Sequence, residues 1–81
     1  MKYQKEIAAN NLKKLRLARG WKQKDVAKLI GLAYSDRISH WEIGTAEPGI
    51  VNLFRLSIIY KTTPLKIYPL LKKVIGENIL Q

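Results

Sequence analysis

The sequence contains no cysteine, so disulfide bonds and zinc sites built from thiolate ligands are excluded. It has one histidine, no glycine-rich phosphate loop, and no set of residues spaced as a catalytic acid pair or a metal site. His40 is the one residue that invites a catalytic assignment, and nothing near it in the sequence completes a triad. We therefore predict that the protein is not an enzyme, holds no metal and uses no cofactor.

Long apolar runs are also missing. No stretch reaches 18 apolar residues, and the first residues, MKYQKEIAANN, lack the apolar core of a signal peptide. These features favour a cytoplasmic protein that neither crosses a membrane nor is secreted. With 81 residues, of which 47% are hydrophobic, and with no repeat or linker, the chain is expected to form a single domain over residues 1–81.

Acidic residues are scarce relative to basic ones. Six Asp and Glu oppose 15 Lys and Arg, which gives a net charge of +9 and favours a polyanionic partner, either nucleic acid or an acidic membrane. A helix that binds a membrane surface would concentrate its lysines and arginines opposite one broad apolar face. Here the basic residues are spread over several segments, so we expect nucleic acid and no membrane.

Apolar residues recur at helical spacing over most of the chain, and no segment alternates with the period of a strand, so we predict an all-α fold. A first helix is predicted over residues 5–19, ending at Gly20. A second helix is predicted over residues 23–30, ending at Gly31. Residues 50–60 are apolar on nearly all sides, which is typical of a buried central helix.

The C-terminal part contains two prolines that mark helix starts. Thr63 and Pro64 have the order of an N-cap and a first helical residue, so a short fifth helix is predicted there. Pro69 would cost about 3 kcal/mol inside a helix, so a further helical segment, the tail 69–81, should begin at that residue. The apolar residues of 70–80 need cover from the domain's own core, from a second copy of the chain or from another protein.

The stretch YSDRISHWE, residues 34–42, combines polar and large apolar side chains. On a helix, Tyr34, Ile38 and Trp41 share one side and the polar residues point away from it. We therefore expect a helix over about 35–42 that its apolar side holds to the domain. Taken alone, this pattern is also that of an ordinary amphipathic surface helix.

Two short helices joined by a turn that contains glycine form a helix-turn-helix, the second being the recognition helix. The residues here resemble the lambda-repressor-like (Cro/CI-type, Xre-like) helix-turn-helix DNA-binding family. The resemblance covers about residues 11–68 and implies a compact five-helix DNA-binding domain, to which the C-terminal helical segment is added. It rests on these residues in order: Leu15-Arg16, Gly20 to Ala27 (GWKQKDVA), Gly31, Ile38 to Glu42 (ISHWE), Gly44 and Pro48.

The resemblance implies two structural roles. Arg16 and Glu42 match the family's buried arginine–glutamate pair, which ties the first helix to the end of the recognition helix. Breaking such a pair typically costs about 3–5 kcal/mol. Gln23 matches a glutamine that holds a phosphate and braces the recognition helix.

The resemblance also aims the polar side of the recognition helix at the major groove of DNA. Arg37 suits guanine, His40 suits guanine or a phosphate, and Asp36 suits cytosine N4 or the task of orienting Arg37. Lys13 and Lys14 fit phosphate contacts and plain solvated charge equally well. The candidates for base readout are Ser35, Asp36, Arg37, Ser39 and His40, and those for phosphate contacts are Lys22, Gln23, Lys24 and Thr45.

Three features depart from the family pattern. The turn between Gly31 and Ile38 is one residue longer than the commonest spacing, so either Tyr34 or Ser35 caps the recognition helix. Lys22 stands where the family usually has a serine or threonine cap. The loop that follows Gly44 carries Glu47, where a basic residue is common, which should weaken its attraction to DNA.

Together these features predict a sequence-specific regulator of transcription that binds double-stranded DNA as a homodimer. An alternative function for the same fold is that of a DNA-binding antitoxin in a toxin–antitoxin pair, whose main partner is another protein. Copurification with a protein partner would distinguish the two.

Overall fold

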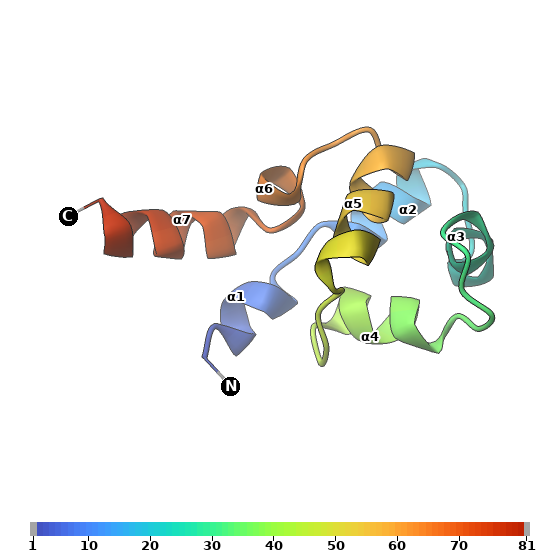
Figure 1. Cartoon of the computed structure of the whole chain (residues 1–81), viewed down its shortest axis with the longest axis horizontal. Coiled ribbons are helices and arrows are strands. Elements are labelled where there is room, and N and C mark those ends of the chain that lie inside the picture. Colours follow the sequence, from blue (N-terminus) through green and yellow to red (C-terminus); the bar gives the residue numbers. More distant parts are fainter. Residues whose placement is uncertain (1, 81) are drawn as a thin grey trace.

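The computed structural model describes residues 2–80, and this part of the chain forms seven α-helices and no strand (Figure 1). None of these helices combines the length and the apolar character needed to cross a bilayer. The prediction of an all-α fold with a five-helix core and an added C-terminal helix is confirmed, the core being α2 to α6. The helices are α1 (Gln4–Ala8), α2 (Leu12–Ala18), α3 (Gln23–Leu29), α4 (Asp36–Ile43), α5 (Ile50–Ile59), α6 (Pro64–Ile67) and α7 (Pro69–Ile79).

The hydrophobic core lies where α2 to α6 converge, and Ile7 of α1 packs into the same cluster. Its most deeply buried large side chains come from three different helices, Val26 of α3, Leu56 of α5 and Ile67 of α6. Trp41 of α4 lies in the same cluster and is 4% exposed. The core therefore joins segments that are far apart in the sequence, and one side of α4 packs into it.

The single helix predicted over residues 5–19 is wrong, because the structure divides it into α1 and α2. Asn10 lies at the break, where its Oδ1 accepts a hydrogen bond from the Leu12 backbone N–H at 3.0 Å. Its Nδ2 donates to the carbonyl oxygen of Ile7 at 2.9 Å. Asparagine side chains that bond to nearby backbone groups compete with helical hydrogen bonds, so the chain turns here.

The prediction that residues 50–60 form a helix buried on nearly all sides is also wrong. Leu56 and Tyr60 are buried, but the opposite side of α5 is exposed. No other segment of residues 2–80 covers that side, which carries Ile50, Val51, Phe54 and Ile58. An apolar helix is therefore only half covered in the folded chain.

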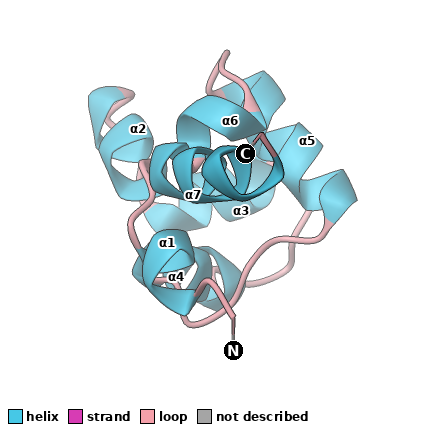
Figure 2. Cartoon of the chain, turned by 90° about the vertical axis from the view of Figure 1, so that its left-hand side faces the viewer, coloured by secondary structure: helices cyan, strands magenta, loops and turns pink. Residues whose placement is uncertain are grey.

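The predicted starts of the last two helices are confirmed. The Thr63 Oγ1 accepts a hydrogen bond from the Lys66 backbone N–H at 3.3 Å, and Pro64 is the first residue of α6. Pro69 begins α7, which projects from the body of the protein and lies beside α1 (Figures 1 and 2). None of the residues of α7 is buried.

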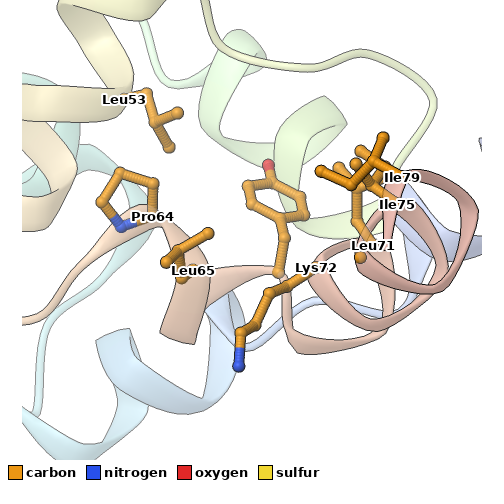
Figure 3. Close-up of a pocket in the computed structure, with 9 residues that line it drawn as sticks. Leu53, Pro64, Leu65, Leu71, Lys72, Ile75 and Ile79 are labelled. Atoms are coloured by element: carbon orange, nitrogen blue, oxygen red, sulfur yellow. The ribbon is translucent and has the colours of Figure 1, made fainter. Parts of the chain in front are cut away.

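An apolar groove of about 350 Å³ opens between α7 and the helices α5 and α6 (Figure 3). We call it the α5–α7 groove. Lys72 is its charged lining residue, and Figure 3 shows its ammonium group directed away from the apolar side chains. The apolar lining includes Leu53, Pro64, Leu65, Leu71, Ile75 and Ile79.

Candidate nucleic-acid interface

The first helix of the helix-turn-helix, α3, begins without a side-chain cap from Lys22, whose ammonium group cannot accept a hydrogen bond. Asp25 compensates, because its Oδ2 accepts a hydrogen bond from the Lys22 backbone N–H at 2.8 Å. This is the acidic half of a capping box. The start of α3 is thus stabilised by a residue three positions inside the helix.

The second helix, α4, is fixed to the domain along one side. Ile38 and Trp41 are buried, and they pack in the core with Val26 and Ala27 of α3. The turn before α4 passes through Gly31, which adopts φ 82°, and the Leu32 backbone N–H donates to the Ala27 carbonyl oxygen at 2.8 Å. A left-handed glycine of this kind is the usual way to end a helix.

The ion pair that the sequence predicts is present, and it fixes the C-terminal half of α4. Arg16 Nε lies 2.7 Å from Glu42 Oε2, and Arg16 Nη2 donates to Glu42 Oε1 at 3.0 Å. The hydrogen bond to Glu42 raises the pKa of Arg16, against the lowering effect of burial. The Glu42 side chain is 4% exposed, so the pair is shielded from water.

Gln23 takes part in the same cluster. Its Nε2 donates to Glu42 Oε1 at 3.1 Å, while Arg16 Nη1 donates to the Trp21 carbonyl oxygen at 3.0 Å. Gln23 therefore braces α4 from the first turn of α3. One carboxylate thus receives donors from both α2 and α3.

Two contacts that the sequence reasoning did not predict hold the end of α4 against α1. Asn10 Nδ2 donates to the Trp41 carbonyl oxygen at 3.1 Å. Gly44 ends α4 with φ 90°, and a Cβ atom at this position would overlap the backbone of Ala8. The pair of asparagines at 10 and 11, inside an otherwise helical pattern, was the signal in the sequence.

The outward side of α4 carries the predicted base-reading residues, and we call this set the recognition surface: Ser35, Asp36, Arg37, Ser39 and His40. Asp36, Arg37 and His40 are exposed, and Ser35 and Ser39 are partly exposed. Across residues 2–80, no hydrogen bond or ion pair engages any of these five side chains. Their polar groups are therefore free to bind a ligand.

Two open questions about the recognition surface are answered by the same geometry. Asp36 makes no ion pair with Arg37, so it does not orient that guanidinium group in this structure. Ser35 is the N-cap residue of α4, and its side chain makes no capping hydrogen bond. Neither Tyr34 nor Ser35 caps the recognition helix through its side chain.

The predicted inward position of Tyr34 is wrong. Ile38 and Trp41 are buried as expected, but Tyr34 is 78% exposed. Because α4 begins only at Asp36, Tyr34 belongs to the turn before it, and the helical angle used to place it does not apply. The Tyr34 side chain therefore lies at the surface, before the first residue of the recognition helix.

The phosphate candidates flank the recognition surface. Lys22 and Lys24 are exposed at the start of α3, and Thr45 is exposed directly after α4. The Thr45 hydroxyl donates to the His40 carbonyl oxygen at 3.4 Å, whereas Gln23 is partly buried by its contact with Glu42. Lys13 and Lys14 are exposed on α2.

A hollow of about 370 Å³ adjoins the recognition surface beside the segment that follows α4. It is lined by Arg37 and His40 from α4 and by Glu47 and Asn52 from the segment that follows. Glu47 thus lines the same hollow as Arg37 and His40, and its negative charge should weaken the local attraction to an anion. Within the described part of the chain, no group of three or more acidic or histidine side chains is placed to hold a metal ion.

Comparison with known proteins gives one match. A model of the helix-turn-helix family matches residues 12–67, from the start of α2 to the end of α6. Searches of curated proteins and of solved structures found no match. The family match covers more than half of the chain and includes both helices of the motif, so the protein belongs to the lambda-repressor/Cro/Xre-like helix-turn-helix family of DNA-binding regulators.

Proposed function

We propose that the protein is a sequence-specific regulator of transcription that places α4 in the major groove of double-stranded DNA. The observation that carries this proposal is the division of α4 into two sides. One side is held by Trp41, Ile38 and the Glu42 cluster, and the other presents polar groups with no partner in residues 2–80. Hydrogen-bonding groups on a rigid support are what direct readout of base edges requires.

Each exposed group has a role that follows from its chemistry. Arg37 pairs with N7 and O6 of guanine, and His40 donates to guanine N7 or to a phosphate. Asp36 accepts from cytosine N4, and Ser35 and Ser39 bond to bases or phosphates. Lys22, Lys24, Gln23 and Thr45 hold the DNA backbone on either side and contribute attraction without sequence preference.

The charge of the protein supports the same partner. The net charge of +9 attracts a polyanion, and ten of the 15 basic residues lie in residues 1–42, which include α3 and most of α4. Attraction of this kind supplies affinity but no sequence preference, which must come from the recognition surface.

Selection of bound DNA from a random pool tests the proposal. We expect an enriched sequence with two copies of a short half-site in inverted orientation, centred about 34 Å apart, because one recognition helix reads only a few base pairs. Enrichment of no sequence, with binding that falls steeply as salt rises, would show a nonspecific DNA-binding protein and contradict the proposal.

We further propose that two copies of the chain associate through the α5–α7 groove. Helix α7 has 11 residues and none of them is buried, although a helix of this length is marginal in water without packing. We propose a two-fold pairing in which the axis is perpendicular to α7, so that α7 lies antiparallel to its copy. Lys72 and Lys73 near its start would then face Glu77 near the end of the other helix, so charges of opposite sign would meet.

Sedimentation of the protein, free and bound to the selected DNA, tests this association. We expect a dimer on DNA, and we expect Ile75→Asp to produce a monomer that still contacts one half-site, because a charge would be placed in the apolar groove. A strict monomer in both states contradicts the dimer. Copurification of a different protein, lost in Ile75→Asp, would instead support the antitoxin alternative.

A further inference from the structure

Tyr34 is a large, exposed side chain beside the recognition surface, and no contact within residues 2–80 gives it a structural role. It is 78% exposed, and no hydrogen bond within residues 2–80 engages its hydroxyl group. It lies two residues before the start of α4, in the turn that joins α3 to α4. The N-terminal residues of a recognition helix are those that approach base edges, so Tyr34 stands beside the base-reading end.

A hollow of about 310 Å³ separates Tyr34 from α4. It is lined by the apolar residues Leu32 and Ala33 and by Tyr34 of the turn, together with Asp36 and Arg37 of the recognition surface. The hollow thus joins an apolar surface to the arginine that suits guanine. A ligand that fills it must offer an apolar group next to a hydrogen-bond acceptor.

The chemistry of the major groove offers one such group. Among the four bases, only thymine presents an apolar group there, its 5-methyl, whereas guanine presents the acceptors N7 and O6. A phosphate fits less well, because it offers acceptors but no apolar group to cover Leu32 and Ala33.

We propose that Tyr34 is a specificity-determining residue whose ring contacts the 5-methyl group of a thymine next to the guanine bound by Arg37. This inference rests on the proposed function and extends the recognition surface by one base pair. The contact needs no hydrogen bond from the Tyr34 hydroxyl. It is made possible by the position of Tyr34 in the turn before α4, where its side chain is exposed.

Single-methyl substitution of the DNA tests the contact. Starting from the selected duplex, each thymine of one half-site is replaced in turn by deoxyuridine, which lacks only the methyl group. For the parent protein we expect one position next to the guanine to weaken binding about fourfold, the value of one buried methyl group. For Tyr34→Ala we expect equal binding to the thymine and deoxyuridine duplexes.

Two further variants separate this contact from other roles. Tyr34→Phe should keep the full methyl effect, because it removes only the hydroxyl group. Leu17→Ala, which alters an exposed apolar residue on α2, should bind both duplexes as the parent does.

Three results would overturn the inference: no thymine next to the guanine, no position sensitive to the methyl group, or a methyl effect that persists in Tyr34→Ala. Loss of affinity in Tyr34→Phe without a methyl effect would show a phosphate contact instead. In all these cases a selected sequence that depends on Arg37 would leave the proposed function intact. Failure to select any sequence would instead remove the proposed function itself.

Discussion

The recognition surface on α4 and the α5–α7 groove both face solvent, but they expose opposite chemistry. The recognition surface is polar and lies on a helix whose other side is buried. The groove is apolar and is bounded by a helix that has no buried residue. The comparison shows that the two exposed regions suit different tasks. Polar groups that are held rigidly are suited to specific hydrogen bonds, whereas uncovered apolar groups favour association with another apolar surface.

Truncation of Trp41 should give the largest effect and the sharpest test of the anchored side. Trp41→Ala removes a side chain that is 4% exposed, so we expect the free energy of unfolding to fall by about 3–5 kcal/mol in urea titrations. The matched change in α7, Ile79→Ala, alters a side chain that is 72% exposed. It should cost less than about 0.5 kcal/mol at protein concentrations where the chain is monomeric. Equal effects would abolish the contrast between the two regions.

The ion pair is the second anchor of α4. Arg16→Ala and Glu42→Ala should each lower the free energy of unfolding by about 3 kcal/mol, because each leaves a buried charge without its partner. The double variant should lose much less than the sum, since it leaves no uncompensated charge. A double-mutant cycle by urea unfolding measures the difference. Simple addition would mean that the two residues do not interact in solution.

A third prediction separates specificity from attraction on the DNA-facing side. Arg37→Ala should cost about 1–3 kcal/mol on the selected sequence and much less on random DNA, because only the matching base edge completes its hydrogen bonds. Lys24→Ala should weaken binding to all sequences alike and reduce the salt slope by about one. Titrations over a panel of duplexes at several salt concentrations provide the measurement. Identical behaviour of the two variants would make the recognition surface a nonspecific docking site.

The smallest effect is expected beneath the α5–α7 groove. The Tyr68 hydroxyl is buried and has no hydrogen-bond partner in residues 2–80. Tyr68→Phe should therefore raise the free energy of unfolding, by about 1 kcal/mol, since an unpaired buried polar group is costly. A destabilised Phe variant would show that the hydroxyl is satisfied in solution.

Tyr68 also predicts the direction in which the free energy of unfolding changes with pH. Burial, with a smaller contribution from Glu47, raises the pKa of Tyr68 to about 12, above its usual 10.0. As the pH rises, the phenol therefore ionises first in the unfolded chain. This group leaves the free energy of unfolding unchanged below pH 10 and lowers it between pH 10 and 12. Burial raises the pKa of Tyr60 to about 12 as well. Tyr68→Phe should lose less stability over this interval than the parent does.

Much of the fold followed from local features of the sequence. The helical period, the glycines that end α3 and α4, and the prolines that begin α6 and α7 act through nearby residues alone, and each was located correctly. The partnership of Arg16 and Glu42 spans 26 positions. It was predicted from the family resemblance, and the cost of leaving a buried charge without a partner explains its importance for stability.

The errors occurred where the outcome depends on distant segments. The contact of Asn10 with α4 was missed because it joins residues 31 positions apart in the sequence. The exposed side of α5 was missed because an apolar pattern indicates that a helix tends to be buried but does not identify the segment that would cover it. Tyr34 was misplaced because the pattern of α4 was extended into the turn.

The sequence by itself predicted most of the helix ends and, through the family resemblance, the helix-turn-helix, because helical periodicity and helix termination are local properties. Only the tertiary structure decided which apolar side chains are left uncovered, because burial is set by all the segments that meet at one place. It was therefore packing that left Tyr34 beside the recognition surface and kept α7 free of buried residues.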